Sequence, residues 1–275
     1  MIREALNYPP SGKHGSRAVV VGGLFFAVLA VAIVTSGYLL SRELSAEFPT
    51  SEATEQALMT DELFVILIAV ALFYLSIHLL VRGYYVAVLR TVVGVANPVA
   101  PRFRIRALVD GIKSALILFG YLVPALVLGG LGLFIRRPST PETENAVINT
   151  VGAFAFLLGL FALIAAAYLV PAATALFAQQ NSVRAAFEFS RVRTCVFTED
   201  YAVGWVFAGV MRLIVVPIAI LLEFILVGFF LRFYLHVSIQ HLYAIAVTSA
   251  LGLTADDSNN GGDTPAEDPL HPSVG

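Results

Sequence analysis

The chain has 275 residues, of which 58% are hydrophobic and only 13% are charged, and its formal net charge is −2. Soluble domains carry roughly 25% charged residues, so a soluble fold of this length could not cover its surface with polar groups. The charges cluster between apolar runs of about 20 residues, the length that crosses a hydrocarbon core. This pattern predicts an all-α polytopic membrane helical bundle, and the net charge indicates no nucleic-acid partner.

Six apolar runs define the predicted transmembrane helices. In chain order they cover residues 18–40, 63–81, 114–134, 151–170, 202–222 and 229–248. The first run is longer than the apolar region of a signal peptide, so we interpret it as a retained helix. Residues 1–17 then form an N-terminal segment and residues 18–250 the membrane domain. Residues 254–275, rich in Asp, Asn, Gly and Pro, are predicted to be a disordered acidic tail.

The last two helices are predicted to form a tight hairpin. Thr198 followed by Glu199 and Asp200 has the residues of a helix cap with acids in the first turn. The connection to the final helix, near Gly228, is short, so the two helices should pack against each other. Glu223 and Arg232 lie on either side of this turn and are expected to pair.

Small residues recur at helical spacing in two of the predicted helices. They are Ala125, Gly129 and Gly132 in the third helix, and Ala155, Gly159, Ala162 and Ala166 in the fourth. Such stripes let two helix backbones approach closely in a membrane, so we expect helix–helix contacts there.

Basic residues are distributed unequally between the two sides of the predicted membrane domain. With the N-terminus inside, 12 of them lie in the inner segments and three in the outer loops. Because cytoplasmic loops carry an excess of Lys and Arg, this bias predicts a multi-pass protein of the plasma membrane with both termini in the cytoplasm.

The two inner connecting segments resemble each other. A shift of 84 residues aligns four identical pairs, which are Tyr84 with Tyr168, Asn97 with Asn181, Val99 with Val183, and Phe103 with Phe187. The order of helix, tyrosine, connector and basic stretch also matches, so we predict an internal parallel repeat. Parallel repeats occur in transporters, where the substrate site lies at the repeat interface. Duplication also builds helical bundles of other functions.

Both connectors interleave basic and apolar residues, as segments that lie in the membrane interface do. We expect anionic lipid headgroups to contact the basic side chains of Arg102, Arg104, Arg106, Lys113, Arg184, Arg191 and Arg193. A docking surface for a soluble partner is the alternative interpretation.

Three polar residues fall near the middle of the last two predicted helices. Arg212 is central in one, and Gln240 and His241 lie at about the same depth in the other. A charge at the bilayer centre costs at least about 2.5 kcal/mol, so each such residue needs a reason. These residues are candidates for substrate binding, as an anion or proton site. The alternative is an interhelical clamp that holds the hairpin together.

The sequence contains no pattern that indicates catalysis, a metal site or a cofactor. Histidines lack partner carboxylates at metal-ligand spacing, and no nucleophile stands next to a base. Cys195 is the single cysteine, so no intrachain disulfide can form. We therefore expect a protein that is not an enzyme and holds no metal or cofactor.

Several short motifs resemble an uncharacterised family of archaeal multi-pass membrane proteins, domain of unknown function 4013, common in haloarchaea. They are the opening segment 1–9, the segment Gly83–Arg90, the step Asp110–Lys113, the segment Ala185–Phe189, and Phe233 with Tyr234. The resemblance covers roughly residues 1–250. It departs after Tyr243, where relatives carry glycine and basic residues. The resemblance implies location and fold, and supplies no chemistry.

These observations favour a carrier or permease-like protein for a small solute or ion, on the strength of the repeat and the polar layer of Arg212, Gln240 and His241. The alternative is a non-transporting membrane scaffold or accessory protein that recruits a partner through its basic connectors or acidic tail. A polar cavity that reaches the middle of the bundle between the repeats would favour transport.

Overall fold

The structure is a computed structural model that describes residues 2–47, 61–95, 97–135 and 146–253. The predicted disordered tail and most of the predicted loops 41–62 and 135–150 lie outside these residues. The described residues form α-helices and no strand, in agreement with the predicted all-α bundle. They are α1 (Ile2–Asn7), α2 (Gly12–Glu47), α4 (Asp61–Val92), α5 (Ala107–Ile135), α6 (Ala146–Gln180), α7 (Val183–Ala186), α8 (Phe189–Val196), α9 (Glu199–Glu223) and α10 (Val227–Ala250).

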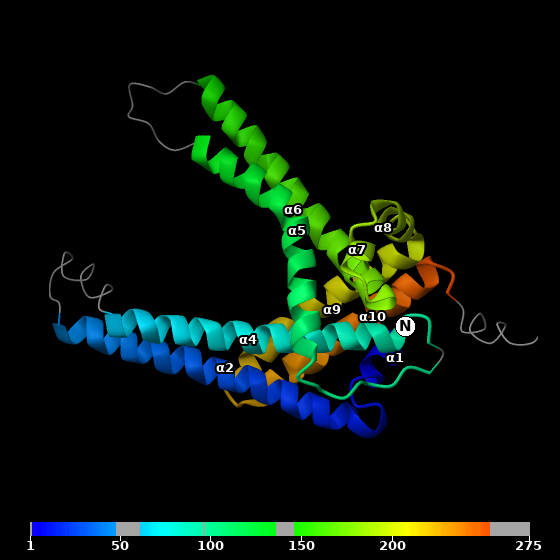
Figure 1. Cartoon of the computed structure of the whole chain (residues 1–275), viewed down its shortest axis with the longest axis horizontal. Helices are drawn as coiled ribbons and strands as arrows, with labels where there is room; N and C mark the ends of the chain where they lie inside the picture. The colour runs from blue at the N-terminus through cyan, green and yellow to red at the C-terminus, as the bar shows by residue number, and fades with distance from the viewer. Residues whose placement is uncertain (1, 48–60, 96, 136–145, 254–275) are drawn as a thin grey trace, which may run out of the picture.

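The long helices form two arms that diverge from a common junction (Figure 1). One arm consists of α2 and α4, which run side by side, and the other of α5 packed along α6. Helices α9 and α10 lie at the junction. The N-terminus, α1, α7 and α8 gather at the end of the molecule away from the tips of the arms.

Among the residues that the structure describes, five helices are long and apolar enough to cross a membrane: Gly12–Tyr38, Leu67–Val92, Ala107–Ile135, Val147–Gln180 and Glu199–Glu223. The sixth predicted span is also a helix, α10, but it contains one arginine, two histidines and a glutamine. It contacts α1, α2, α4, α6, α8 and α9, and 13 of its 24 residues are buried. The protein shields its most polar long helix by placing it in the centre of the bundle.

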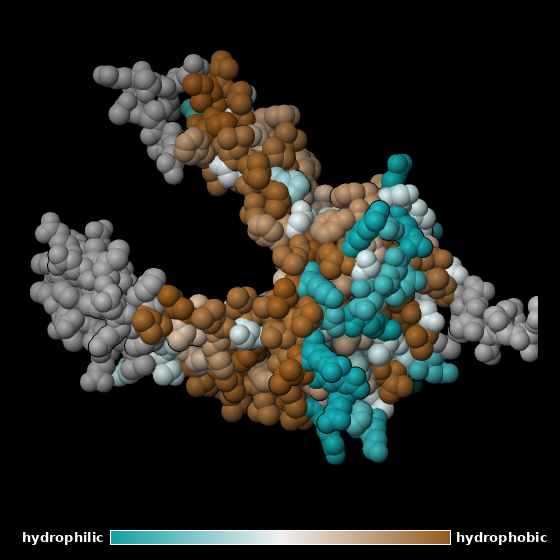
Figure 2. All heavy atoms as spheres, in the orientation of Figure 1, coloured by the Kyte–Doolittle hydropathy of each residue, from teal (hydrophilic) through white to brown (hydrophobic). Residues whose placement is uncertain are grey.

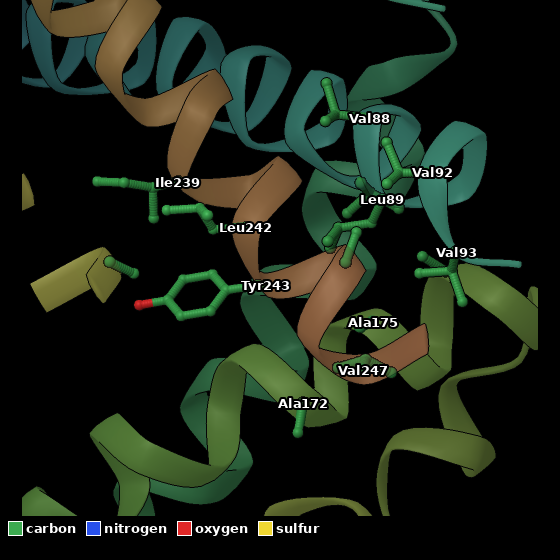
Figure 3. Close-up of a cluster of buried hydrophobic side chains, with 14 of the residues drawn as sticks. Val88, Leu89, Val92, Val93, Ala172, Ala175, Ile239, Leu242, Tyr243 and Val247 are labelled. Atoms are coloured by element: carbon green, nitrogen blue, oxygen red, sulfur yellow. The ribbon is translucent and has the colours of Figure 1, made fainter. Parts of the chain in front are cut away.

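A cluster of buried hydrophobic side chains lies between α4, α6 and α10 (Figure 3). Val88 and Leu89 of α4, Ala172 and Ala175 of α6, and Leu242 of α10 are all at most 1% exposed. Small residues on α6 let α10 and α4 approach it closely. Within this core α4 and α6 continue beyond the predicted spans, which end at residues 81 and 170.

Small residues also explain the close packing inside the second arm. A Cβ atom added at Gly159 would collide with the backbone of Gly129, and one added at Gly132 would collide with the backbone of Gly152 and Phe156. The predicted stripes of small residues therefore lie at the contact between α5 and α6.

The hairpin of α9 and α10 is as tight as predicted. Thr198 caps α9, because its hydroxyl oxygen accepts a hydrogen bond from the backbone N–H of Tyr201 at 3.3 Å. The turn places Leu226 at a φ of 64°, and a Cβ at Gly228 would collide with the carbonyl oxygen of Ala219. Only glycine permits so close an approach of α10 to α9.

Candidate functional site

A cavity of about 470 Å³ lies at the junction of the two arms, and all six long helices contribute to its walls. Its polar lining includes Arg82 from α4, Arg212 from α9, and Arg232, His236 and Gln240 from α10. The rest of the lining includes aromatic and small apolar residues. The predicted pair of Arg212 and Gln240 therefore shares one cavity inside the bundle, and Arg82 joins it from the first arm.

Arg82 is positioned by the close packing of α4 against α5. Its Nε donates to the Ser114 hydroxyl oxygen at 3.0 Å, and its Nη2 donates to the Ser114 carbonyl oxygen at 3.2 Å. The two helices come this close because Gly83 and Gly111 have no side chain. A Cβ at either glycine would collide with the backbone of the opposite helix. Ser114 is buried and neutral, so it orients the guanidinium without balancing its charge.

Arg232 is held by a carboxylate. Its Nη1 donates to Glu223 Oε1 at 2.8 Å, across the turn between α9 and α10. The guanidinium also lies over the ring of Phe26, 5.6 Å from its centroid, which is the geometry of a cation–π contact. The pairing expected from the sequence is therefore confirmed, and α2 takes part in it through Phe26.

His236 lies one turn further along α10. Its Nδ1 is 2.7 Å from the carbonyl oxygen of Arg232. A carbonyl only accepts, so Nδ1 carries the proton, and in the neutral ring Nε2 is then an acceptor. The ring stacks on Tyr85 at 5.9 Å between centroids. The hydroxyl of Tyr85 is buried and has no hydrogen-bond partner among the described residues.

Arg212 completes the cavity from α9. It lines this cavity together with Tyr85, His236 and Tyr243. It forms no hydrogen bond or ion pair with any residue that the structure describes. Arg212 is thus the least constrained of the three arginines, and its guanidinium faces an open polar space.

The structure does not bring His241 to this cavity. Its ring stacks on Tyr8 at 4.3 Å and is 3% exposed, beside a second pocket of about 520 Å³ that α1, α4 and α10 line. Successive residues of an α-helix point about 100° apart, so adjacent residues face different neighbours. The predicted polar layer is therefore divided, with Gln240 on the side of Arg212 and His241 on the side of the N-terminus.

Tyr8 anchors the N-terminal segment at this second pocket. Its hydroxyl shares a 2.8 Å hydrogen bond with Thr91 of α4. Burial raises the pKa of Tyr8 to about 12, and the hydrogen bond to Thr91 opposes that rise. Tyr234 of α10 also donates to the carbonyl oxygen of Leu6. These contacts tie the opening motif of the chain to α4 and α10.

Sequence reasoning missed an ion pair within the first connecting segment and a hydrogen bond that links it to the second. Arg90 of α4 binds both carboxylate oxygens of Asp110 at 2.7 and 3.0 Å, and also donates to the side-chain oxygen of Asn181 at 2.9 Å. Asp110 is the single acidic residue of the first connector, and this feature of the sequence could have indicated the ion pair. The motifs around Arg90 and Asp110 thus form the joint between α4 and α5.

Most of the predicted lipid-contacting residues lie on the surface, and hydrophilic residues gather at one end of the molecule, away from the tips of the arms (Figure 2). All of them are exposed except Lys113, which is half-buried. They are Arg102, Arg104 and Arg106 before α5, Lys113 in α5, Arg184 in α7, and Arg191 and Arg193 in α8. Glu188 lies 3.9 Å from Arg191, and Arg193 lies over Phe197. The arms beyond this end are predominantly apolar.

Apolar helices of membrane-spanning length, with polar residues gathered at one end, define the class of this chain as a multi-pass membrane protein. Residues 63–227, more than half of the chain, match the model of the family described as protein of unknown function (DUF4013), and the chain belongs to that family. The match is narrower than the resemblance over residues 1–250 that the motifs indicated. Comparison with curated proteins and with solved structures gave no match.

Proposed function

We propose that this protein is a carrier or permease-like protein that binds a small solute or ion in the cavity at the junction of the arms. The observation that carries the proposal is the set of three arginines, Arg82, Arg212 and Arg232, around a polar space inside an otherwise apolar bundle. A bundle whose only task is to pack has no use for such a space, because each buried charge raises the cost of insertion.

The position of Arg212 supports this proposal. It lies about 17 Å from the nearer end of α9, at 1.5 Å per residue, so the proposal puts its side chain near the middle of the bilayer. An arginine at this depth costs about 2.5–3.5 kcal/mol on insertion scales. The clamp alternative requires a partner for it, and among the described residues Arg212 has none within hydrogen-bond distance.

The place of the cavity relative to the predicted repeat also supports transport. Helices α4 and α6, which the shift of 84 residues aligns, both line it. Tyr84 and Tyr168, the aligned tyrosines, are both in the C-terminal halves of these helices. Binding sites at the interface of parallel repeats are a feature of transporters. The repeat itself stays a prediction.

The proposal places both termini in the cytoplasm of an archaeal cell, with the protein in the plasma membrane. The exposed basic residues of the two connectors would then contact anionic headgroups, each contributing about 1 kcal/mol. The proposed activity is movement or binding of a solute without chemical conversion, so no enzyme activity and no cofactor are part of it.

Solute flux in reconstituted vesicles tests this function. Purified full-length protein would be reconstituted, and uptake of a panel of anionic, cationic and neutral solutes measured. Arg212→Leu should abolish uptake of the transported solute, because it removes the unpaired charge of the cavity. Arg3→Leu, an identical change on the exposed surface of α1, serves as the matched control. Equal uptake by the Arg212→Leu and Arg3→Leu proteins would refute the role of the cavity.

One observation favours the second candidate, a scaffold that recruits a partner. Ile105 and Phe197, next to the exposed arginines of the connectors, are 84% and 82% exposed. Apolar side chains among basic ones suit a lipid interface and also suit a protein partner. Absence of flux for every solute in the panel would leave this candidate in front.

A further inference from the structure

The charged residues that line the cavity are all arginines. None of the described residues that line it is Asp or Glu. Glu223 forms its ion pair with Arg232, and no carboxylate in the described part of the chain lies within ion-pair distance of Arg82 or Arg212. These two arginines therefore carry two positive charges that the described residues do not balance.

Hydrogen-bond donors around the two arginines are also unused. Ser114 engages Nε and Nη2 of Arg82, which leaves Nη1 available. Arg212 has all its donors available, and the buried hydroxyl of Tyr85 has no acceptor. Of these donors the Tyr85 hydroxyl is buried, and a buried donor without an acceptor is destabilising, whereas Arg212 is exposed. A ligand with several acceptor oxygens would engage the exposed guanidinium and the buried hydroxyl at once.

Two guanidinium groups match a phosphoryl group in charge and in shape. A phosphate monoester carries about −1.5 to −2 charges and three acceptor oxygens, whereas a carboxylate carries one charge and two oxygens. Guanidinium binds phosphate oxygens in a bidentate geometry. A carboxylate would leave one of the two arginines without a counter-charge, so charge balance favours the phosphoryl group.

We propose that the cavity binds a phosphoryl group between Arg82 and Arg212, with the Tyr85 hydroxyl as a further donor. This inference rests on the proposed function, because it names the chemical class of the solute for the same cavity. The group can belong to a free or solute phosphate, or to the headgroup of a phospholipid whose acyl chains lie along the apolar arms. The chemistry at the arginines is the same in both cases.

Equilibrium binding of radiolabelled inorganic phosphate to the delipidated full-length protein in maltoside detergent tests the first source. Retention of phosphatidic acid, with diacylglycerol as the control that lacks the phosphate, tests the second source by native mass spectrometry. Arg212→Gln should weaken the binding that is observed by about tenfold or more, since a charge-assisted hydrogen bond contributes roughly 1.5–3 kcal/mol. Arg3→Gln should leave it unchanged.

Arg212→Gln is the informative variant because Arg212 makes no hydrogen bond or ion pair to the described protein, so its loss leaves the fold intact. Arg82→Gln also removes the contacts to Ser114, so its binding is compared only if its thermal unfolding matches the wild type. Arginine-dependent binding of either probe supports the inference. Binding of neither probe, or equal binding by Arg212→Gln, overturns it.

The two proposals fail in different ways. Arginine-dependent phosphate or phosphatidic acid binding without any flux would sink the carrier function and leave the phosphoryl site standing. Arg212-dependent flux of a solute that carries no phosphoryl group, with no binding of either probe, would keep the carrier function and overturn the phosphoryl site.

Discussion

The three arginines of the cavity show how one side chain can be accommodated inside a bundle in three ways. Arg232 has a carboxylate partner at 2.8 Å, Arg82 has a neutral serine, and Arg212 has no partner among the described residues. Compensation of the charge by the protein's own groups decreases in that order, and exposure increases with it, because Arg232 and Arg82 are half-buried whereas Arg212 is exposed. The residue with the least compensation is the one we expect a ligand to contact.

Cys195 shows the opposite behaviour, because its environment suppresses its reactivity. It is fully buried in α8, and burial raises the pKa of its thiol from an ordinary value of 9.0 to about 11. The thiolate is the nucleophile, so at neutral pH its population is about 100-fold below that of a free cysteine. We predict that maleimide labels the native protein only slowly at pH 7.5 and labels it fully once unfolded in dodecyl sulfate.

Mass spectrometry of the intact protein measures this labelling. Because Cys195 is the only cysteine, Cys195→Ala should show no labelling in either condition. The labelling rate should rise with pH, since deprotonation of the thiol becomes significant only as the pH approaches 11. Rapid stoichiometric labelling of the native protein at pH 7.5 would contradict the burial described above.

At the same scale, the sequence predicts how deep a side chain lies in the bundle better than which neighbours it faces. Arg212 and Gln240 were predicted from their central positions, and both line the cavity. His241 was assigned to the same layer and faces Tyr8 instead, because helix rotation is set by packing that one sequence does not show. Arg82 was counted only as one of the basic residues of the first connecting segment. Its place in the cavity was not predicted, because its contact with Ser114 depends on the close approach of Gly83 and Gly111.

At the scale of elements, the apolar runs predict where helices exist but not where they end. Helix α4 continues to Val92 and α6 to Gln180, well past the predicted spans that end at residues 81 and 170. Their inner halves are buried against α10, so tertiary packing rather than lipid stabilises them. The start of α9 was predictable because its cap is a local feature of Thr198 and the following residues.

The contact between α5 and α6 leads to a prediction with a matched control on the same helix pair. Gly159→Ala should lower the thermal unfolding temperature in detergent, because its Cβ would collide with the backbone of Gly129. Overpacking of this kind costs roughly 1–3 kcal/mol. Gly130→Ala adds a Cβ where nothing lies within 4 Å, so it should have no effect or raise stability through its higher helix propensity.

Differential scanning fluorimetry of the two variants beside the wild type separates these effects. Both changes add one methyl group to a glycine in a long helix, so the difference between them reports the close approach alone. If Gly159→Ala unfolds at the same temperature as Gly130→Ala or above it, α5 and α6 do not pack as closely as described.

At the scale of the whole molecule, the polar and apolar segments of the sequence occupy different parts of the structure. The described basic connectors, α7 and α8 gather at one end, and the two arms beyond them are apolar (Figure 2). The polar helix α10 lies between them, surrounded by the others, and carries the polar side of the cavity. Positive charge at one end and a shielded polar centre are the arrangement that a bundle inserted with its basic end in the cytoplasm requires.

This arrangement predicts the orientation of the protein in the cell. In a Cys195→Ala background, Val147→Cys at the outer start of α6 and Ser182→Cys at the inner start of α7 give two exposed single-cysteine markers. A membrane-impermeant maleimide should label Val147→Cys in intact cells and label Ser182→Cys only after lysis. The physical reason is that the arginines beside Ser182 resist translocation across the membrane, whereas the segment before Val147 carries few basic residues. The reverse labelling pattern would place the basic connectors outside, and would remove the anionic inner headgroups as their partner while leaving the chemistry of the cavity unchanged.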